Sequence, residues 1–422
     1  MKQIRLRYLA EVNPPTPQFD RLRGADEVCF LPLEAVWSDA RLDLSRRRPW
    51  QDVSTGYVRF AEGDILSPKV TPTFQAGRSA IVSRIPGGAG AATTEVHVLR
   101  ARPGLADPRY VRYALLTKRF LEEGMSRFQG VAGLQRVPDD FLRDFQVTDR
   151  PFEEQRRIAD FLDDQTSRID GIVSGRTQMI DLIDERAKSE IQCLVLGRVD
   201  GGPRSDPGGP VLPAPVDWGV RRNKTFLREV VDLSESGEEE MLTVSHLTGV
   251  TPRSEKTVYM FEAETNEGYK RVRPGDLVIN TLWAWMGALG VAHQAGIVSP
   301  AYGIYRITDP NATPAYFDAL FRSAAYVSEM TRYSKGVWSS RLRLYPESFL
   351  ALRSPFPQPE VQRSIAVHVS GIARNAEAMR QPLKSSIALL QERKRSLITA
   401  AVTGEFDVSS ASPRAADAVV SG

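Results

Sequence analysis

An internal repeat limits what this chain can fold into more than any other feature of its sequence. Residues 154–159 (Glu-Gln-Arg-Arg-Ile-Ala) recur as residues 361–366 (Val-Gln-Arg-Ser-Ile-Ala), 207 positions later. Farther upstream, residues 56–65 align with residues 268–277 at an offset of 212, and each copy contains Gly-Asp. Segments that recur in the same order at nearly the same offset indicate a duplicated structural unit. We therefore predict a tandem duplication of a globular region followed by a long helix.

Heptad spacing supports the long helix in both copies. Rows of residues seven apart are mostly apolar, as at the a and d positions of a coiled coil. In the first copy the rows are Ile158, Gln165, Ile172, Met179, Arg186 and Cys193, with Leu162, Ile169, Arg176, Ile183 and Glu190. In the second copy they are Ile365, Ile372, Met379, Ser386, Arg393 and Ala400, with Val369, Ala376, Leu383, Leu390 and Leu397. Two helices of about 44 residues, each ~66 Å long, are predicted to pair as an antiparallel coiled coil.

Proline and glycine residues define the predicted ends of these helices. Pro151 and Pro359 stand at the two starts, and Gly197 and Gly404 follow the two ends. The helical segments are assigned to residues 151–200 and 357–407. Pro382 lies inside the second segment and is expected to kink or break that helix, because proline lacks the amide hydrogen that an internal helical position donates.

The globular regions, residues 1–150 and 211–356, have the pattern of mixed α/β domains. Glycine and proline interrupt short strand-like runs at residues 29–33, 79–83, 96–100, 277–280 and 302–307. Each region is expected to end in one shorter helix, at about residues 110–120 and 315–330, and the Gly-Asp pairs at 63–64 and 275–276 predict turns that lead into strands. A Gly/Pro-rich linker at 201–210 joins the halves, and the tail at 408–422 is expected to be disordered. The predicted fold class is α+β.

The composition excludes several classes of protein. Hydrophobic residues make up 42% and charged residues 25% of the 422 residues, which is the balance of a globular protein. No apolar run is long enough to span a membrane, and we expect a cytoplasmic protein. Cys29 and Cys193 are too few for a disulfide framework, and the four histidines lack metal-ligand spacing.

The sequence contains no recognisable catalytic constellation. The absence of any Gly-Lys dipeptide excludes a Walker A phosphate loop. Asn13-Pro14-Pro15-Thr16 is similar to the catalytic tetrapeptide of adenine methyltransferases, but Thr16 stands where that motif has the aromatic residue that stacks on the flipped base. Residues 392–394 (Glu-Arg-Lys) match a nuclease fragment, yet they lie in a predicted helix, where surface ion pairs are the simpler interpretation.

Several motifs, taken in their order and spacing, carry a family resemblance. They are residues 154–162 (Glu-Gln-Arg-Arg-Ile-Ala-Asp-Phe-Leu) with Ile169-Asp170, residues 392–398 with 401–404 (Ala-Val-Thr-Gly), and residues 63–66 (Gly-Asp-Ile-Leu). With the duplication, they resemble the specificity subunits of type I restriction–modification enzymes. The resemblance covers residues 5–407 in architecture, and Val361 departs from it where glutamate is usual.

This resemblance implies a non-catalytic subunit that reads DNA. Each globular region would be a target-recognition domain for one half of a split, asymmetric DNA sequence, and the helix pair would fix the spacing between the halves. Two methyltransferase subunits and up to two endonuclease subunits are the implied partners. No cofactor is expected in this chain, and AdoMet, ATP and Mg²⁺ are expected in the partner subunits.

Residue chemistry suggests where DNA contacts lie. Arginine and glutamine side chains can form the paired hydrogen bonds that guanine and adenine edges require, while lysine, serine and tryptophan supply phosphate and stacking contacts. The candidates in the first region are Lys69, Thr71, Thr73, Gln75, Arg78, Arg127, Gln129, Gln135 and Arg136. Those in the second region are Trp283, Trp285, Lys335, Trp338, Ser339, Ser340, Arg341 and Arg343. At least one of Trp283 and Trp285 is expected in the core, and residues 46–48 (Arg-Arg-Arg) are either a phosphate clamp or a solvated run.

Residues outside the heptad seam form a second candidate surface, where the family resemblance implies docking of methyltransferase helices. They are Ile180, Ala187, Ile191, Ile387 and Ile398. Two other functions stay open: a coiled-coil scaffold with two protein-binding modules and no role on DNA, and an orphan DNA-binding protein without restriction–modification partners.

Overall fold

The computed structural model describes residues 2–37, 40–130, 135–198, 212, 214–255, 265–336 and 342–408, which form two compact units. Unit 1 consists of Met1–Gln178 with Leu383–Gly422, and unit 2 is Met179–Pro382. Each unit therefore contains one globular region and a portion of both long helices, whereas the sequence analysis treated the helices as segments of their own. Those segment boundaries stay a prediction. The linker at 201–210 and the tail from residue 409 lie outside the described residues.

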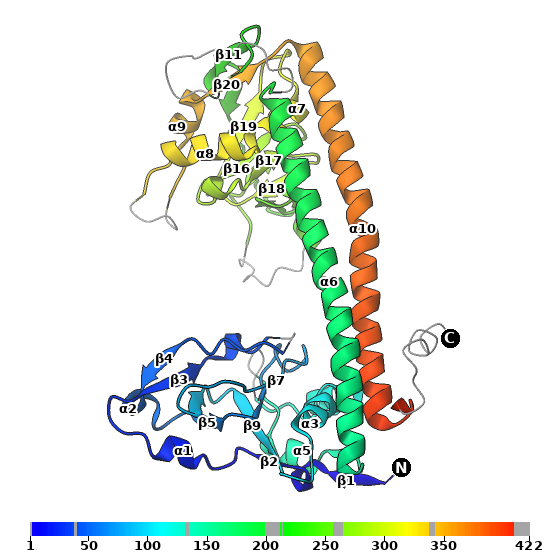
Figure 1. Ribbon diagram of the computed structural model, residues 1–422. Helices are drawn as coiled ribbons and strands as arrows, with labels where there is room; N and C mark the ends of the chain where they lie inside the picture. The colour runs from blue at the N-terminus through cyan, green and yellow to red at the C-terminus, as the bar shows by residue number, and fades with distance from the viewer. Residues whose placement is uncertain are drawn as a thin grey trace. The chain divides into compact units, whose positions relative to one another are not determined.

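Unit 1 is built on two four-stranded sheets (Figure 1). One has the order β2 (Ala10–Val12), β9 (Val96–Ala101), β6 (Ile65–Pro68), β7 (Ala80–Ile81). The other has the order β4 (Arg47–Pro49), β3 (Glu27–Leu31), β8 (Ala89–Ala92), β5 (Val58–Ala61), with β3 and β8 parallel. Strands β1 (Gln3–Arg5) and β10 (Gln146–Thr148) form a separate antiparallel pair. Short helices connect these strands: α1 (Pro17–Asp20), α2 (Trp50–Val53), α5 (Asp139–Asp144) and the 3₁₀ turns Leu6–Tyr8 and Leu33–Ala35.

Unit 2 repeats the four-stranded sheet that carries the Gly-Asp turn. Its order is β12 (Leu227–Glu229), β19 (Tyr302–Ile307), β16 (Leu277–Asn280), β17 (Leu289–Val291). The remaining strands pair two by two: β11 (Gly219–Arg222) with β20 (Arg353–Phe356), β13 (Leu242–Ser245) with β14 (Gly249–Pro252), and β15 (Lys270–Val272) with β18 (Gly296–Val298). Helix α9 (Pro346–Ala351) and the 3₁₀ turns Asn223–Thr225, Arg253–Glu255 and Ala284–Met286 also belong to this unit. The five predicted strand runs all contain a strand, and the predicted α+β class is confirmed.

The shorter helix predicted at the end of each globular region is instead a pair of helices. Unit 1 has α3 (Pro108–Ala114) and α4 (Lys118–Ser126), and unit 2 has α7 (Pro314–Phe321) and α8 (Ala324–Tyr333). The break comes where a hydroxyl caps the second helix: Thr117 accepts the Phe120 amide at 3.4 Å, and Ser323 accepts the Tyr326 amide at 3.3 Å. Such a cap fixes a non-helical residue at the start of a helix, which the apolar pattern alone did not reveal.

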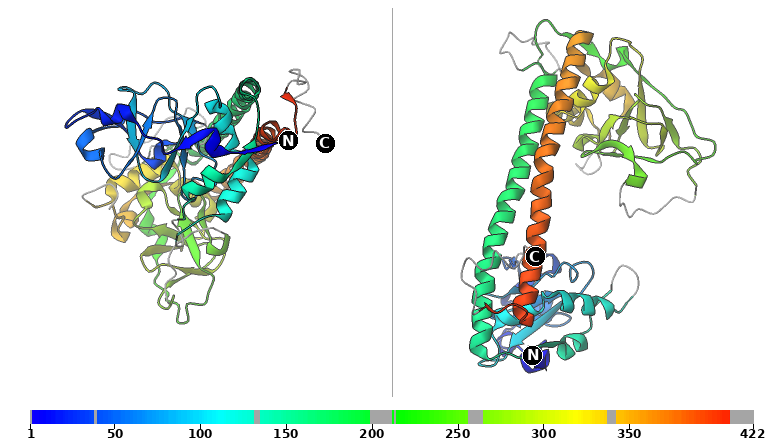
Figure 2. Two further views of the ribbon diagram at one scale, coloured as in Figure 1. Left: turned by 90° about the horizontal axis from the view of Figure 1, so that it is seen from below. Right: turned by 90° about the vertical axis from the view of Figure 1, so that its right-hand side faces the viewer.

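The two long helices are α6 (Phe152–Val195) and α10 (Pro359–Thr403). In unit 1, Lys394 on α10 forms an ion pair with Asp170 on α6 at 2.7 Å. In unit 2, Arg380 on α10 pairs with Asp184 on α6. Also in unit 1, Arg176 on α6 donates to Ser386 on α10. The partner on α10 therefore moves back from Lys394 to Ser386 as α6 advances from Asp170 to Arg176, so the helix portions of unit 1 run antiparallel. The helix portions of unit 2 have the same relative direction (Figure 2). This confirms the predicted pairing.

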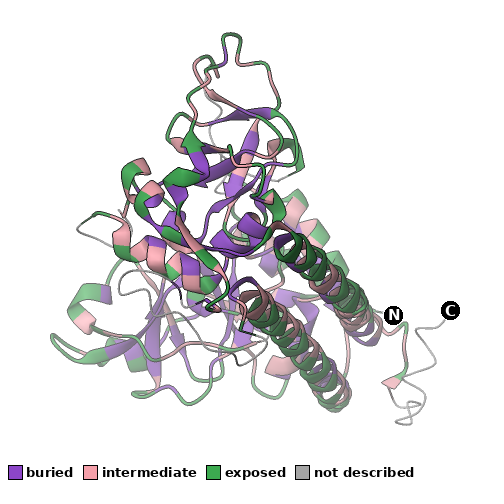
Figure 3. Ribbon diagram, turned by 90° about the horizontal axis from the view of Figure 1, so that it is seen from above, coloured by how far each residue is buried: buried purple, intermediate pink, exposed green. Residues whose placement is uncertain are grey.

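The predicted seam between the helices is partly wrong. Ile158, Leu162 and Ile169 are buried in unit 1 as expected. However, Ile172 is 47% exposed, and Met179 and Met379 of unit 2 are about half exposed at 52% and 51%. A straight helix turns every 3.6 residues, so a strict seven-residue row drifts around its surface. Figure 3 shows exposed residues along both long helices and buried residues concentrated in the sheets.

Pro382 does not break the second helix. Helix α10 continues from Pro359 to Thr403 with Pro382 inside it. Neither Gly171 nor Gly175 interrupts α6. Proline removes one backbone hydrogen bond from a helix, but a helix of this length retains many backbone hydrogen bonds on both sides of Pro382.

The repeated glutamine of the Glu-Gln-x-x-Ile-Ala motif fastens each long helix to its globular region. Gln155 is fully buried, accepts the Asp107 amide at 3.1 Å, and donates to the carbonyls of Leu105 and Arg150 at 3.0 and 2.9 Å. Gln362 is also fully buried. It repeats the pattern with the Thr313 amide at 2.8 Å and the carbonyls of Asn311 and Pro357 at 3.1 and 2.8 Å. The side chain thus satisfies two backbone groups just before α3 or α7 and one carbonyl just before the long helix itself.

Each hydrophobic core also contains residues from the C-terminal end of the second long helix in its unit, which is α10 in unit 1 and α6 in unit 2. In unit 1, Leu397, Ile398, Ala401 and Val402 of α10 are buried in the main hydrophobic cluster. In unit 2, Val195 of α6 occupies the corresponding cluster, and Ile191 packs against it. Polar contacts repeat too, because the Lys118 amide donates to Thr399 and the Ala325 amide donates to Gln192. The two donors, Lys118 and Ala325, are 207 residues apart in sequence, and so are the two acceptors, Gln192 and Thr399. Each globular region is therefore held by both helices.

Candidate nucleic-acid interface

Two predicted clusters of the first region meet at a short hairpin in unit 1. The amides and carbonyls of Gln129 and Arg136 bond reciprocally at 2.9 and 2.8 Å. The segment after β6 lies on the other side of this hairpin, since the Thr71 amide donates to Gln135 at 3.1 Å and the Val137 amide donates to Lys69 at 2.8 Å. Backbone pairing therefore brings Lys69, Thr71, Gln129, Gln135 and Arg136 together, although they come from two separate stretches of sequence. Residues 131–134 lie outside the described residues.

The side chain of Arg136 is exposed and held in one orientation. Its guanidinium contacts both carboxylate oxygens of Glu95, the shortest distance being 2.6 Å. These hydrogen bonds lower the pKa of Glu95 below its ordinary value. An arginine fork held by a carboxylate is preorganised for a planar, paired acceptor such as a guanine edge.

The other candidates of the first region have different environments. Gln75 and Arg127 are exposed, whereas the Thr73 hydroxyl donates to the Val70 carbonyl at 2.7 Å. Arg78 is partly buried, with one guanidinium nitrogen 3.4 Å from the Val36 carbonyl. Thr73 and Arg78 therefore support the loop conformation in this structure.

Unit 2 contains a hairpin of the same kind. Lys335 and Arg343 exchange backbone hydrogen bonds at 2.9 Å in both directions, and the Leu344 amide donates to Thr281 at 2.9 Å. This pairing brings Lys335 and Arg343 beside the segment that leads to Trp283. The predicted contacts Trp338, Ser339, Ser340 and Arg341 lie outside the described residues.

The aromatic candidates of the second region differ in exposure. Trp283 is 51% exposed, while Trp285 is partly buried and donates its indole N–H to the Leu282 carbonyl at 3.0 Å. Neither belongs to a buried hydrophobic cluster of the described residues, so the expectation that at least one lies in the core is wrong. Sequence reasoning missed Tyr345, whose ring lies 5.8 Å from the Lys335 ammonium and 5.5 Å from the Arg343 guanidinium. Its position two residues after Arg343, where alternate side chains of an extended segment share a side, was the available signal.

Comparison with known proteins identifies the relatives of this chain. No protein-family model matches it. The chain is 34% identical over 156 residues to the specificity subunit of the type I restriction enzyme EcoAI of Escherichia coli, and 31% identical over 153 residues to that of EcoEI of the same species. The chain is related to the specificity subunits of type I restriction enzymes. Each match covers 36% of this chain and 26% of the relative, so it spans about a quarter of the length of these curated proteins.

Solved structures extend the comparison to the whole fold. A chain from a study of the assembly and conformational transition of a type I restriction–modification system aligns with a TM-score of 0.67 at 16% identity, covering 96% of this chain and 98% of that one. The HsdS subunit of Thermoanaerobacter tengcongensis aligns over 96% of this chain with a TM-score of 0.45, also at 16% identity. The first of these neighbours shows that the chain shares the fold of a protein from a type I system.

The residues predicted to dock partner subunits of a type I enzyme are only partly accessible. Ile180, Ala187 and Ile387 are half-buried on the long helices. Ile398 is 3% exposed within the core of unit 1, so its assignment to an accessible surface is wrong. The heptad row placed Ile398 away from the partner helix, but at this end of α10 the globular region covers that face. Ile191 likewise packs against the core of unit 2.

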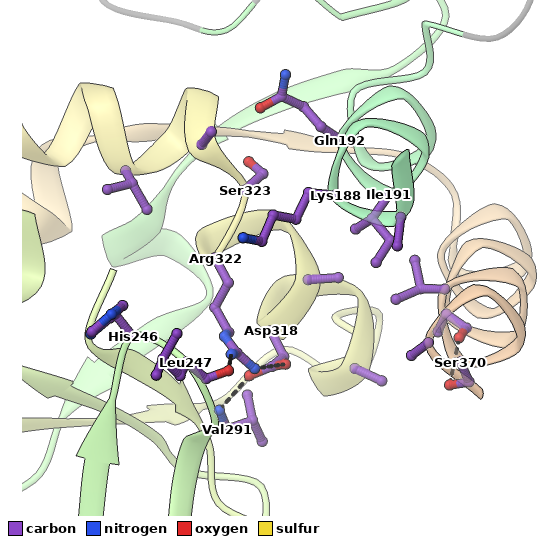
Figure 4. A pocket seen from close by; sticks show the side chains of 18 of the residues that line it. Lys188, Ile191, Gln192, His246, Leu247, Val291, Asp318, Arg322, Ser323 and Ser370 are labelled. Carbon is purple, nitrogen blue, oxygen red and sulfur yellow. Dashed lines mark hydrogen bonds and ion pairs between the residues drawn. The ribbon is translucent and has the colours of Figure 1, made fainter. Parts of the chain in front are cut away.

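A cavity of about 1370 Å³ lies in unit 2 between the globular region and the portions of α6 and α10 that belong to it (Figure 4). Arg322 lines this cavity. One of its guanidinium nitrogens lies 3.8 Å from a carboxylate oxygen of Asp318, and another donates to the Leu247 carbonyl at 3.0 Å. Asp318 also accepts the Val291 amide at 2.7 Å, and burial raises the pKa of this carboxyl. Of the predicted site residues, Ala187, Ile191 and Trp285 line the cavity.

The arginine run at residues 46–48 lies partly on the edge strand β4. Arg46 pairs with Glu34 at 3.1 Å, and the Arg48 guanidinium lies 4.0 Å from the centre of the Phe30 ring. Charged side chains of this kind protect a sheet edge from pairing with other strands.

The described residues contain no group of three or more histidine, cysteine, aspartate or glutamate side chains arranged to hold a metal ion. Among these same residues, no helix is sufficiently long and apolar to cross a membrane.

Proposed function

We propose that this chain is the DNA-reading subunit of a type I restriction–modification complex, and that each hairpin reads one half of a bipartite, asymmetric target. The observation that carries this proposal is the repeated hairpin: Gln129 and Arg136 in unit 1 correspond to Lys335 and Arg343 in unit 2. Both present long polar or cationic side chains on a backbone fixed by reciprocal hydrogen bonds. Such side chains can contact base edges and phosphates.

The differences between the two hairpins support an asymmetric target. Unit 1 offers glutamine and arginine, which favour adenine and guanine edges, whereas unit 2 offers lysine and arginine with the aromatic side chains Tyr345 and Trp283. Two identical readers would select a palindrome. Two different readers on one chain select unrelated half-sites, and binding of one half raises the effective concentration of the other.

We further propose that the chain itself is not catalytic and that two methyltransferase subunits dock on its helices. These subunits would bring AdoMet, and up to two endonuclease subunits would bring ATP and Mg²⁺. Exposed apolar side chains on the helices support a docking role, including Met179 and Leu182, which are 52% and 56% exposed. Such a complex would act in the cytoplasm.

The experiment that tests this function is duplex binding by the chain co-expressed with its methyltransferase subunit. Wild type is expected to bind in a salt-dependent manner, because phosphate contacts release counterions. Arg136→Ala is expected to weaken binding by about tenfold and to relax discrimination at one half-site, as loss of a paired base contact does. Arg221→Ala, which removes the pair with Asp309 away from the hairpin, is the matched arginine control. Salt-independent or absent binding would favour a protein scaffold instead.

A further inference from the structure

A buried histidine lies directly beneath the hairpin of unit 1. His97 on β9 is 0% exposed, and its Nε2 is 3.1 Å from the carbonyl oxygen of Val137. Val137 is the residue whose amide bonds Lys69, so it belongs to the pairing that assembles the candidate interface. The imidazole therefore contacts the backbone that positions the proposed DNA-reading side chains.

The second ring nitrogen also contacts an acceptor. His97 Nδ1 lies 3.1 Å from Asp139 Oδ1, although the two groups are not aligned for a full hydrogen bond. The other oxygen of Asp139 accepts the Asn13 side-chain amide at 2.7 Å, and Asn13 in turn accepts the Val98 amide. The carboxylate is thus fixed by a neighbour other than the histidine.

Neither neutral form of the ring satisfies both contacts. A neutral imidazole has one N–H and one lone pair. If Nε2 carries the hydrogen, the Nδ1 lone pair faces a carboxylate, and if Nδ1 carries it, the Nε2 lone pair faces a carbonyl. Only the doubly protonated imidazolium presents an N–H to each acceptor.

Burial opposes that charged form in the free protein. Desolvation lowers the pKa of His97 below its ordinary value, and the facing charges act in opposite directions: Asp139 on α5 raises the pKa, and Lys69 on the segment after β6 lowers it. The ring is consequently neutral near pH 7, with one of its two contacts unfavourable. A DNA phosphate near Lys69 and Arg136 would add negative potential and favour the proton.

We propose that His97 is a positioning residue that takes up a proton when the hairpin of unit 1 binds DNA, so that the imidazolium holds Val137 and Asp139 together beneath the bound strand. This inference rests on the proposed function, because it requires duplex DNA at the hairpin. It adds a proton to that binding reaction. Linkage then makes the affinity for DNA rise as the pH falls.

The test is the affinity of the methyltransferase complex for a labelled duplex that carries the sequence methylated in the host, measured from about pH 6.5 to 8 at constant ionic strength. Uptake of up to one proton predicts that binding tightens by about threefold to tenfold for each unit of decrease in pH. In His97→Gln this dependence is expected to disappear, because the amide side chain does not titrate. His368→Gln changes an exposed histidine on α10 and is expected to retain the wild-type profile.

A second variant changes the acceptor and leaves the histidine in place. Asp139→Asn keeps the histidine but removes the anion that favours its charge, and it is expected to flatten the pH profile as well. Calorimetry in two buffers of different ionisation enthalpy counts the protons directly. If wild type and both variants have the same pH dependence, the proton coupling is wrong while the DNA-reading function stands. If wild type shows no salt-sensitive binding at any of these pH values, the proposed function and this inference both fail.

Discussion

Arg100 holds the buried carboxylate of Asp64 with two parallel hydrogen bonds, of 2.7 and 2.8 Å. Asp64 is 0% exposed and also accepts the Ala61 amide, which closes the turn at Gly63. Arg306 repeats the arrangement on Asp276 with two bonds of 2.9 Å, at the turn that contains Gly275. Both glycines have positive φ angles, of 87° and 90°, a backbone conformation that side chains disfavour. The repeated Gly-Asp thus fastens a turn to the central strand of each sheet, as the sequence analysis predicted for its structural role.

Removing the buried carboxylate should destabilise unit 1. Asp64→Ala leaves the Arg100 guanidinium and the Ala61 amide without their partner, and the free energy of unfolding is expected to fall by about 3 kcal/mol. Urea denaturation measures this loss. Asp20→Ala, which breaks the exposed pair with Arg59, is the control and is expected to cost less than about 1 kcal/mol. Equal losses in the two variants would contradict the importance of burial.

The two buried glutamines should contribute similar amounts to the stability of their separate units. Gln155→Ala and Gln362→Ala each leave three backbone groups unsatisfied, and each is expected to cost about 2 kcal/mol. Because the residues share no partner, the double variant should lose the sum. Gln381→Ala, at an exposed position of α10, is the control and should change the free energy of unfolding by less than about 0.5 kcal/mol. A marked departure from additivity would show that the two anchors are coupled.

Acid should weaken unit 1 through Asp139. Its contacts with His97 first, and also with Asn13, lower the pKa of this carboxyl to about 2. A carboxyl with a lowered pKa stabilises the folded state above the pKa of the unfolded chain, and that stability is lost as the pH falls toward 2. Wild type should therefore exceed Asp139→Asn in stability at neutral pH, and the difference should shrink below about pH 4. A difference that stays constant down to pH 2 would contradict this assignment.

The lysines at the two hairpins should contribute independently to the salt dependence of DNA binding. Lys69→Ala and Lys335→Ala each remove one phosphate contact, so the slope of log affinity against log salt is expected to fall by about one for each variant. Filter binding across a salt series measures the slope. Lys224→Ala, at the 3₁₀ turn Asn223–Thr225, serves as the lysine control. An unchanged slope in both hairpin variants would show that these lysines do not contact DNA phosphates.

The exposed apolar side chains of α6 should matter for assembly and not for folding. Met179→Ser and Leu182→Ser change residues that are about half exposed, so the midpoint of thermal unfolding should shift little. Co-purification of the methyltransferase subunit is expected to decrease, because the apolar contact area is lost. Asp181→Ser, between them in sequence and also exposed, is the control. Normal co-purification of the double variant would locate the docking surface elsewhere.

The sequence predicted the large features because they are periodic or repeated. The duplication, the two long helices and the Gly-Asp turns depend on local patterns, and 207-residue offsets even relate contacts such as Lys118 with Thr399 and Ala325 with Gln192. The residues that lie between the two long helices were less predictable. Ile172 and Met179 fit an ideal heptad row, but the real helix turns away from it, and the globular region rather than the partner helix decides that Ile398 is buried.

The candidate interface could also be predicted only in part from local sequence patterns. Residue chemistry selected Lys69, Gln129 and Arg136 as candidates, but their proximity depends on backbone pairing between stretches some sixty residues apart, which no local pattern encodes. His97 was inconspicuous in sequence, because its importance lies in two acceptors, Val137 and Asp139, that only the folded chain brings to its ring.

In the proposed function, the two globular regions select the DNA that a partner methyltransferase modifies. Single-molecule sequencing of the host genome, with this gene intact, deleted, or carrying Arg136→Ala, tests it most directly. We expect one bipartite motif of methylated adenines. It should disappear on deletion, and in the Arg136→Ala strain only one of its halves should become degenerate. An unchanged pattern of methylation after deletion, with the methyltransferase still expressed, would contradict it.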